Sequence, residues 1–264
     1  MKIWYQSYTR IGFDPRWKSY EDDLNAYVQK VARPGTRVDV HGVQKMAPKM
    51  FESDYIQQMH VAQVIDNALQ AEREGYDAFC VGGTLDLGHV SLREVLDIPV
   101  AFIAESSFYA ACLLARKFAI VGQGEKSLRR KLELVTYHGL EQRCVPGAHM
   151  NSNNLEIIDL LGQDPQRFID MFTEASRKCI AAGAGVLIPG FGAIGSFLGQ
   201  RGIHDIDGIP ILDIVAVVIK TAEMLVDLKN LGLKRTRQGM YSYVSKEELL
   251  AARKIYGVEP ASLT

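Results

Sequence analysis

Two stretches of the sequence decide the fold: AEREGYDAFCVGG at residues 71–83 and CIAAGAGVLIPGFG at residues 179–192. In each stretch the end of a helical pattern reaches a glycine, a short apolar run follows, and the run ends in a second loop that contains glycine. An Ile-Pro segment comes next in both cases, IPV at residues 98–100 and IPI at residues 209–211. The repetition indicates that the chain contains two copies of one α/β unit.

The same alternation of strand and helix runs through the whole chain. Short β-branched or aromatic runs predict strands near residues 2–5, 37–41, 78–81, 99–103, 118–121, 143–145 and 186–189. Apolar residues at helical spacing predict helices near residues 22–31, 56–74, 106–115, 124–137 and 165–182. The sequence therefore predicts an α/β fold with mainly parallel sheets in two pseudo-symmetric domains. We expect one domain at residues 1–104 plus 212–264 and the other at residues 105–211.

Composition excludes several classes of protein. Of 264 residues, 47% are apolar and 23% are charged, as in soluble globular proteins. The 30 Lys and Arg residues against 31 Asp and Glu residues leave a net charge of -1, so there is no basic excess for nucleic acid. The longest apolar run, residues 211–219, is too short to span a membrane, and the start turns polar too soon for a signal peptide. We expect a cytoplasmic protein with no nucleic-acid or membrane partner.

Neither the cysteines nor the histidines are spaced for a metal site. Cys80, Cys112, Cys144 and Cys179 lie far apart in apolar surroundings, which indicates buried, reduced thiols. The six histidines never occur at HxH or HExxH spacing. No metal site is expected.

The strand-end loops of the two units predict a binding cleft. Ligands of open α/β sheets bind at the carboxyl ends of the strands. Two facing sheets would place the loops Gly82-Gly83-Thr84 and Gly190-Phe191-Gly192 on opposite walls of one cleft. Free backbone N–H groups in such turns suit a carboxylate, an imide oxygen or an enolate-like anion.

Several stretches also carry a resemblance to a known family, namely MKIWYQSYT, EGYDAFCVGGTLDLG with DIPVAFIAESS, KFAIVG, GAGVLIPGFG and IPILDIVAVVIKTAEML. In order and spacing they resemble the aspartate/glutamate/hydantoin racemase superfamily, and within it the hydantoin and allantoin racemase branch. The resemblance extends from Lys2 to about Leu228. It implies two flavodoxin-like domains with the active site between them, and no cofactor.

The sequence departs from this family at the two residues that the resemblance makes most important. Family racemases carry one cysteine at each strand-end loop, and the two thiols act as acid and base on opposite faces of an acidic carbon. These positions are Gly83 and Phe191 in this chain. A family decarboxylase that acts on aryl malonates keeps only the second thiol, and Phe191 removes that one too. Cys80 lies inside a strand, so it does not replace either thiol.

Other residues of the strand-end loops are candidates for substrate binding. Gln6, Ser7 and Thr9 match a polar loop that the resemblance associates with the substrate's carboxyl or carbonyl group; the alternative is an ordinary capped turn. Gln123 follows KFAIVG and is a candidate for a substrate hydrogen bond. Phe191 is expected to form an apolar wall for an aromatic or aliphatic substrate group.

Three residues are candidates for catalysis. The Thr84 hydroxyl can donate or accept a hydrogen bond beside the anion site. His89 is a candidate acid or base, with a solvated loop histidine as the alternative. Glu105 is a second candidate, and the alternative is a carboxylate that stabilises a helix N-terminus. Asp86 is expected to cap the helix that follows it.

We therefore predict a cofactor-independent enzyme of the racemase superfamily that acts on an acidic carbon next to a carbonyl or carboxylate of a small molecule. A decarboxylase or lyase, a hydrolase, and a small-molecule binding protein without catalysis remain alternatives. The long loop at residues 44–55 is expected to be a lid or a subunit contact. The tail after Leu233 is expected to pack on a neighbouring subunit of a homo-oligomer.

Overall fold

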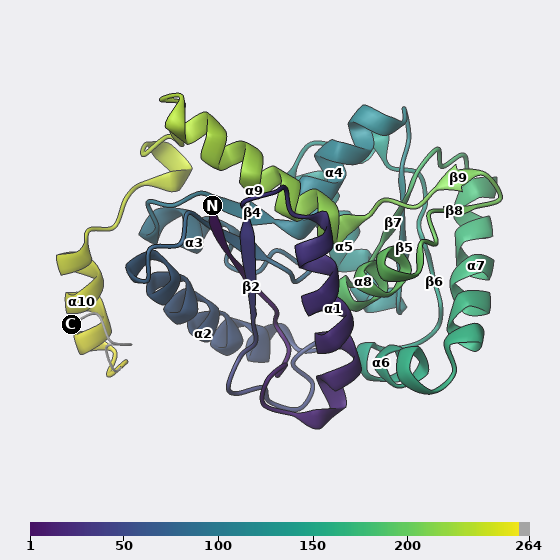
Figure 1. Cartoon of the computed structure of the whole chain (residues 1–264), viewed down its shortest axis with the longest axis horizontal. Helices are drawn as coiled ribbons and strands as arrows, with labels where there is room; N and C mark the ends of the chain where they lie inside the picture. The colour runs from purple at the N-terminus through teal and green to yellow at the C-terminus, as the bar shows by residue number, and fades with distance from the viewer. Residues whose placement is uncertain (259–264) are drawn as a thin grey trace.

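Two parallel sheets form the centre of the computed structural model, which describes residues 1–258 (Figure 1). The first sheet has the order β2-β1-β3-β4, with strands β1 Lys2–Gln6, β2 Arg37–His41, β3 Ala78–Val81 and β4 Val100–Phe102. The second has the order β6-β5-β7, with strands β5 Ala119–Gly122, β6 Ala148–His149 and β7 Leu187–Pro189. A parallel bridge between Leu187 and Ile211 continues it. The strand order of the first half thus recurs in the second, in agreement with the repeat in the sequence.

Helices cover both sheets and connect their strands. They are α1 Lys18–Val31, α2 Asp54–Arg73, α3 His89–Val95, α4 Ile103–Leu114, α5 Glu125–Tyr137, α6 Asn154–Gln163, α7 Pro165–Ala181, α8 Gly192–Arg201, α9 Ile214–Asn230 and α10 Lys246–Ile255. A short antiparallel hairpin, β8 Asp205–Ile206 with β9 Ile209–Pro210, precedes α9. Single 3-10 turns occur at Pro15–Trp17, Glu141–Arg143 and Gly239–Tyr241.

The structure differs from the sequence-based expectations at several element boundaries. Helix α1 begins earlier than expected because the Asp14 side chain caps a 3-10 turn that runs directly into it. Helix α6 was not expected; Asn153 forms a capping box with Glu156 at its start. The strand expected at residues 143–145 is reduced to one bridge between Phe118 and Cys144. Val145 N–H donates to the Phe118 carbonyl, and regular pairing with β5 resumes only at Ala148.

The apolar cores of the two halves are continuous. Phe108 on α4 stacks against Phe118 at the start of β5, with ring centroids 5.8 Å apart. Helix α9 packs on β3 and β4 of the first sheet, although it follows the second sheet in sequence. One apolar cluster therefore runs through both halves and holds them in a fixed relation.

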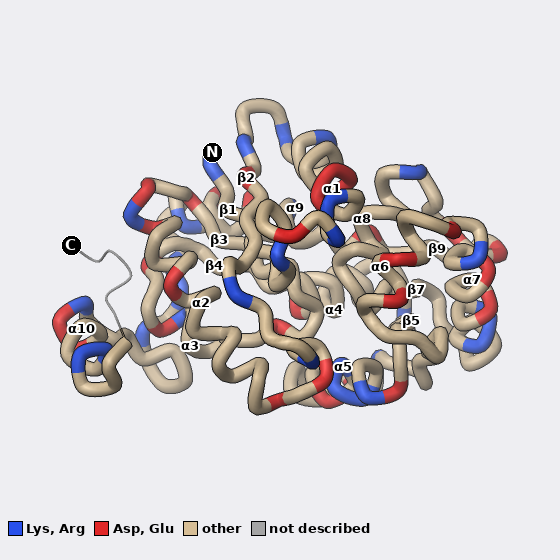
Figure 2. Tube along the Cα trace, turned by 90° about the horizontal axis from the view of Figure 1, so that it is seen from below, with Lys and Arg blue, Asp and Glu red and all other residues tan. Residues whose placement is uncertain are grey.

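Charged residues lie along the outer helices, with both signs interspersed in the view of Figure 2. This distribution agrees with the near-zero net charge. None of the helices between residues 1 and 258 is long and apolar enough to cross a membrane.

Candidate functional site

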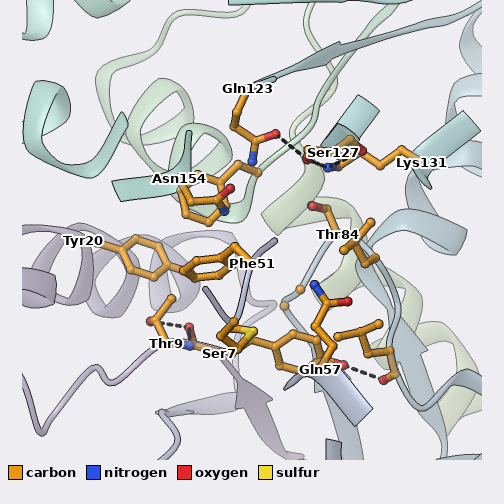
Figure 3. Close-up of a pocket in the computed structure, with 17 residues that line it drawn as sticks. Ser7, Thr9, Tyr20, Phe51, Gln57, Thr84, Gln123, Ser127, Lys131 and Asn154 are labelled. Carbon is orange, nitrogen blue, oxygen red and sulfur yellow. Dashed lines mark hydrogen bonds between the residues drawn. The ribbon is translucent and has the colours of Figure 1, made fainter. Parts of the chain in front are cut away.

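A narrow cavity of about 50 Å³ lies between the two halves at the carboxyl ends of the strands (Figure 3). Ser7 and Thr9 follow β1, residues 82–84 follow β3, Gln123 follows β5 and Phe191 follows β7, and all of them line the cavity. Sequence reasoning predicted these positions, and the structure brings them together. Gly190 and Gly192, which were also predicted to bind substrate, flank Phe191 but do not themselves line the cavity.

The space in front of Gly83 is filled by the ring of Tyr8. A Cβ atom added to Gly83 would lie 2.3 Å from Cδ2 of Tyr8, which is closer than non-bonded carbon atoms approach. The Tyr8 hydroxyl donates a hydrogen bond of 2.5 Å to the carbonyl of Leu87 and so fixes the ring. A cysteine at position 83 is therefore excluded by the present position of Tyr8.

The two strand-end loops meet at the back of the cavity. A Cβ atom on Gly192 would lie 2.9 Å from the carbonyl oxygen of Gly82. The Thr84 hydroxyl donates to the carbonyl of Gly190 at 2.7 Å and links the two loops. The backbone N–H groups of Gly83 and Thr84 have no hydrogen-bond acceptor within residues 1–258. These donors remain available to an anion.

The side wall of the cavity is aromatic. Phe191 is 7% exposed, and its ring meets that of Phe51 edge to face with centroids 6.2 Å apart. Phe51 and Met50 come from the long loop at residues 44–53, which therefore closes the cavity from one side. Phe191 also stands at the N-cap position of α8, and no side chain caps that helix within the described chain. The N-terminus of α8, which is the positive end of the helix dipole, therefore lies next to the cavity.

Two of the binding residues expected from the first strand-end loop lie in the cavity, and one does not. The hydroxyls of Ser7 and Thr9 are 2.8 Å apart. Gln6 points away: its Oε1 accepts from Trp4 Nε1 at 3.0 Å, and its Nε2 donates to the Ser7 carbonyl at 2.8 Å. Gln6 positions the loop instead of contacting a ligand, because a completely buried amide must use its own hydrogen-bonding groups locally.

Gln57 lines the cavity and was not predicted from the sequence. It lies on α2, it is 1% exposed, and its Oε1 has no hydrogen-bond partner in the described part of the chain. Figure 3 shows its side chain pointing into the cavity. A signal existed in the sequence, because Gln57, Val61, Val64 and Ala68 follow helical spacing. The apolar pattern alone would instead place Met59 on the buried face, but Met59 is half exposed.

A second side chain that sequence reasoning missed is Lys131. It lies on α5, is 3% exposed and reaches the cavity. Its Nζ donates to Ser127 Oγ at 2.5 Å, and Ser127 Oγ donates to Gln123 Oε1 at 3.1 Å. Helical spacing places Lys131 on the same face as the buried residues Leu128 and Val135, and this pattern could have identified it.

The titratable groups of the cavity differ in their protonation at neutral pH. Burial lowers the pKa of Lys131 to about 7, and the positive charge of Arg130 adds to this effect. Burial raises the pKa of Tyr20 to about 12. Burial also raises the pKa of Tyr8 well above its ordinary value, and the charge of Asp86 contributes. Near neutral pH both tyrosines stay protonated, whereas Lys131 exists partly as the free amine.

His89 and Glu105 do not line the cavity, in contrast to the expectation that they would share the site. His89 Nε2 lies 3.1 Å from Glu105 Oε1, and the guanidinium of Arg93 contacts both residues, with Nη2 at 2.5 Å from Glu105 Oε2. Burial raises the pKa of Glu105, but hydrogen bonds from His89 and Arg93 outweigh this and lower it to about 2. Glu105 is on the first turn of α4, which directs its side chain toward α3.

The same cluster contains a possible set of metal ligands. Ligand atoms of His89, Glu105 and His138 lie within 4.8 Å of one another. Arg93 is hydrogen-bonded to both His89 and Glu105, so a guanidinium already provides the positive charge at this place. The arrangement does not fit a metal ion.

Asp86 caps a different helix from the one expected. Its carboxylate accepts hydrogen bonds from the backbone N–H groups of Ala104 and Glu105, at 3.0 Å and 2.7 Å, and so caps the start of α4. Sequence spacing suggested α3, which begins three residues later, but a left-handed backbone at Asp86 turns the side chain inward. Burial raises the pKa of this carboxyl to about 7.

The four cysteines are free thiols, and none of them lines the cavity. Cys80 and Cys179 are buried, and their thiols lie against the carbonyls of Val218 and Ile120. Burial raises the pKa of Cys179 to about 11, which keeps it protonated. Cys80 and Cys179 therefore belong to the core, as expected from the sequence, whereas Cys112 and Cys144 are only partly buried.

Comparison with known proteins identifies similar chains. The family model for Asp/Glu/Hydantoin racemase matches residues 18–222. A hydantoin racemase of Pseudomonas sp. (strain NS671) is 29% identical over 234 residues, which cover 87% of this chain and 90% of the relative. A hydantoin racemase of Paenarthrobacter aurescens is 24% identical over 84% of this chain and 91% of its own length. The solved allantoin racemase from Klebsiella pneumoniae superimposes with a TM-score of 0.77 at 21% identity, covering 93% of this chain and 94% of that one.

Proposed function

The chain belongs to the Asp/Glu/Hydantoin racemase family, and we propose that it is a racemase for small, uncharged ring compounds of the hydantoin type. The reaction exchanges the proton at the acidic ring carbon and needs no cofactor. The names of the two curated relatives, both hydantoin racemases, support this substrate class.

One observation carries the choice of substrate: the buried Oε1 of Gln57 has no hydrogen-bond partner in the described part of the chain, and the side chain that carries it enters the cavity (Figure 3). A buried acceptor without a hydrogen bond is costly, so a ligand that occupies this space should supply an N–H donor. Hydantoins carry two ring N–H groups. No arginine lines the cavity within residues 1–258, so the bidentate guanidinium contact that suits the carboxylate of a free amino acid is not available there.

The remaining lining residues have roles that follow from their positions. The N–H groups of Gly83 and Thr84, beside Gly82, stabilise the oxygen that becomes negative when the carbon loses its proton. The hydroxyls of Ser7 and Thr9 and the amide of Gln123 bind the other polar ring atoms. Phe191 and Phe51 enclose the substituent on the acidic carbon.

We also propose that the reaction proceeds without a pair of thiols at the strand-end loops. Gly83 has no side chain, and Tyr8 fills the space in front of it. Phe191 offers no acid or base. His89 and Glu105 are joined to Arg93 outside the cavity, so we assign them to holding α3 and α4 together.

Proton NMR in D2O tests the proposed function. The protein is incubated with single enantiomers of 5-methylhydantoin and 5-benzylhydantoin, and the signal of the ring C5 proton and the optical rotation are followed together. Protein-free buffer at the same pH measures the spontaneous exchange. We expect faster loss of the C5 proton signal and of rotation with protein, without a new product. A ring-opened hydantoin would instead establish the hydrolase alternative, and decarboxylation of an aryl malonate in a parallel incubation would establish the lyase alternative.

The role of Gln57 has its own test. Derivatives methylated at either ring nitrogen lose one N–H donor but keep the ring and its substituent. We expect one of them to bind about tenfold more weakly than the parent compound, because the buried acceptor is left unpaired. The same loss should disappear in Gln57→Leu, which has no acceptor. Equal binding of all three compounds to the unaltered protein would contradict this role.

A further inference from the structure

We propose that Lys131 is the acid/base residue that takes the proton from the substrate carbon. This inference rests on the proposed function and adds the group that the strand-end loops do not supply. Three observations carry it: the position of Nζ, the uncharged surroundings, and the opposite wall of the cavity.

The amine of Lys131 is held in place at the cavity. Nζ donates to Ser127 Oγ at 2.5 Å and to the Ser127 carbonyl at 3.3 Å, one turn earlier on α5. Figure 3 shows Ser127 linking Lys131 to Gln123. Lys131 also lines a smaller cavity behind Thr84 and Gly190, so its side chain lies beside the contact between the two loops. A fixed amine at this point can reach a ring bound against the loops.

No carboxylate neutralises this ammonium group within residues 1–258. Its hydrogen bonds go to neutral oxygen atoms, and the residues that share its two cavities are uncharged. The titratable groups among them are Tyr8 and Tyr20, and the nearest charge that acts on it is the like charge of Arg130. A buried lysine in such surroundings favours its neutral form, which is the form that accepts a proton.

The chemical step is a balanced proton transfer. The lone pair of the neutral amine takes the proton from the ring carbon, and the electrons of the broken C–H bond pass into the adjacent carbonyl to give an enolate. The N–H groups of Gly83 and Thr84 stabilise the enolate oxygen. Return of a proton from the Lys131 ammonium to the same carbon restores the amine and the substrate. In D2O the returned proton is a deuteron, so exchange can be followed directly.

Inversion requires a proton donor on the opposite face of the ring. Figure 3 shows Tyr20 and Lys131 on opposite sides of the cavity. Tyr20 comes from α1 and Lys131 from α5, and each of these helices follows the first strand of its half of the molecule. The hydroxyl of Tyr20 stays protonated near neutral pH and can donate. Inversion then leaves a Tyr20 tyrosinate and a Lys131 ammonium, and transfer of one proton from the ammonium to the tyrosinate through water restores both groups. The pair would perform from helices what the resemblance assigns to two thiols at loops.

The test compares Lys131→Met with Arg129→Met, a matched change on the exposed side of the same helix. We expect C5 deuterium incorporation into 5-benzylhydantoin to fall at least about 100-fold in Lys131→Met and to be unchanged in Arg129→Met. Binding of 5-benzylhydantoin, measured by saturation-transfer NMR, should change by no more than threefold. Lys131→Arg keeps the charge but has no neutral form near pH 7, so it should be inactive too.

A second readout follows the amine itself. In protein labelled with 15N-lysine, one side-chain signal should titrate near pH 7. This signal should be absent from Lys131→Arg. If Lys131→Met does not fold, Lys131→Arg takes its place as the inactive variant. Exchange should decline on the acid side of the same pH. Exchange that survives in Lys131→Met, or a Lys131 signal that titrates near pH 10, would overturn this inference alone. Absence of exchange with the unaltered protein would overturn the proposed function and the inference together.

Discussion

The ring of Tyr8 packs against the backbone of Gly83 and occupies the space that a side chain at position 83 would need. A Cβ on Gly83 would lie 2.3 Å from Cδ2 and 2.5 Å from Cε2 of Tyr8. The ring is fixed by its hydroxyl, which is bonded to the carbonyl of Leu87. The glycine and the tyrosine therefore form one feature, and restoring a thiol at position 83 would require both residues to change.

The first prediction concerns the stability of this contact. Gly83→Ala should lower the free energy of unfolding by about 1–3 kcal/mol, because the added methyl group overpacks the Tyr8 ring. The effect should be smaller in a Tyr8→Ala background, and urea denaturation of the four proteins measures the coupling. Gly162→Ala is the control: no atom lies within 4 Å of its added Cβ, so helix α6 should gain stability. Equal costs of Gly83→Ala in both backgrounds would show that Tyr8 is not the obstacle.

Local patterns predicted the fold well because each pattern acts within a few residues. The glycine-flanked runs at residues 78–83 and 186–192 became β3 and β7 with their loops, and the loops meet as expected. Such patterns fail for β6, because its pairing with β5 is interrupted after the bridge at Cys144 and resumes at Ala148, beyond the expected strand.

The site could be predicted only in part, because the direction of a side chain depends on distant residues. His89 and Glu105 follow strand-end loops in sequence, but Arg93 pairs with both of them away from the cavity. Lys131 is the reverse case, a charged residue on a buried helical face whose cavity exists only when both halves are assembled. The family resemblance implies acid/base groups at the loops, whereas the residues proposed here, Lys131 and Tyr20, come from helices α5 and α1.

Glu105→Gln should reduce stability without reducing exchange, because the carboxylate lies outside the cavity. The folded-state pKa of Glu105 is lowered from 4.5 to about 2, so its stabilising effect is present above pH 4.5 and is lost as the pH falls toward 2. The Gln variant should lose roughly 2–3 kcal/mol at pH 7 and show less of the acid-dependent loss. Urea unfolding between pH 7 and pH 3 measures this. Loss of C5 exchange in a well-folded Glu105→Gln protein would restore a catalytic role.

Asp86 should show the opposite dependence on pH. Its folded-state pKa is raised from 3.8 to about 7, so the protein should become less stable as the pH rises through this interval. Asp86→Asn keeps an acceptor for the N–H groups at the start of α4, tolerates the left-handed backbone, and should remove the dependence. Asp86→Ala should cost about 1–3 kcal/mol at pH 5, because two backbone donors lose their partner. Thermal unfolding of the three proteins at pH 5 and pH 8 measures these differences. If the melting temperatures of the unaltered protein and Asp86→Asn change equally between the two pH values, Asp86 is not the source of the pH dependence.

Phe191→Ala should change which substrates bind best. The ring of Phe191 packs edge to face on Phe51 and forms the cavity wall that we propose receives the substituent of the substrate. Removing it should weaken binding of 5-benzylhydantoin by about 3–10-fold, since an aromatic pair contributes about 0.5–1.5 kcal/mol beyond its buried area. Binding of 5-methylhydantoin should change less than twofold, because a methyl group does not reach this wall. Phe13→Ala, at a phenylalanine that is 52% exposed, is the matched control and should leave both affinities unchanged. Equal losses for the two hydantoins in Phe191→Ala would mean that this residue supports the fold of the loop and does not select the substituent.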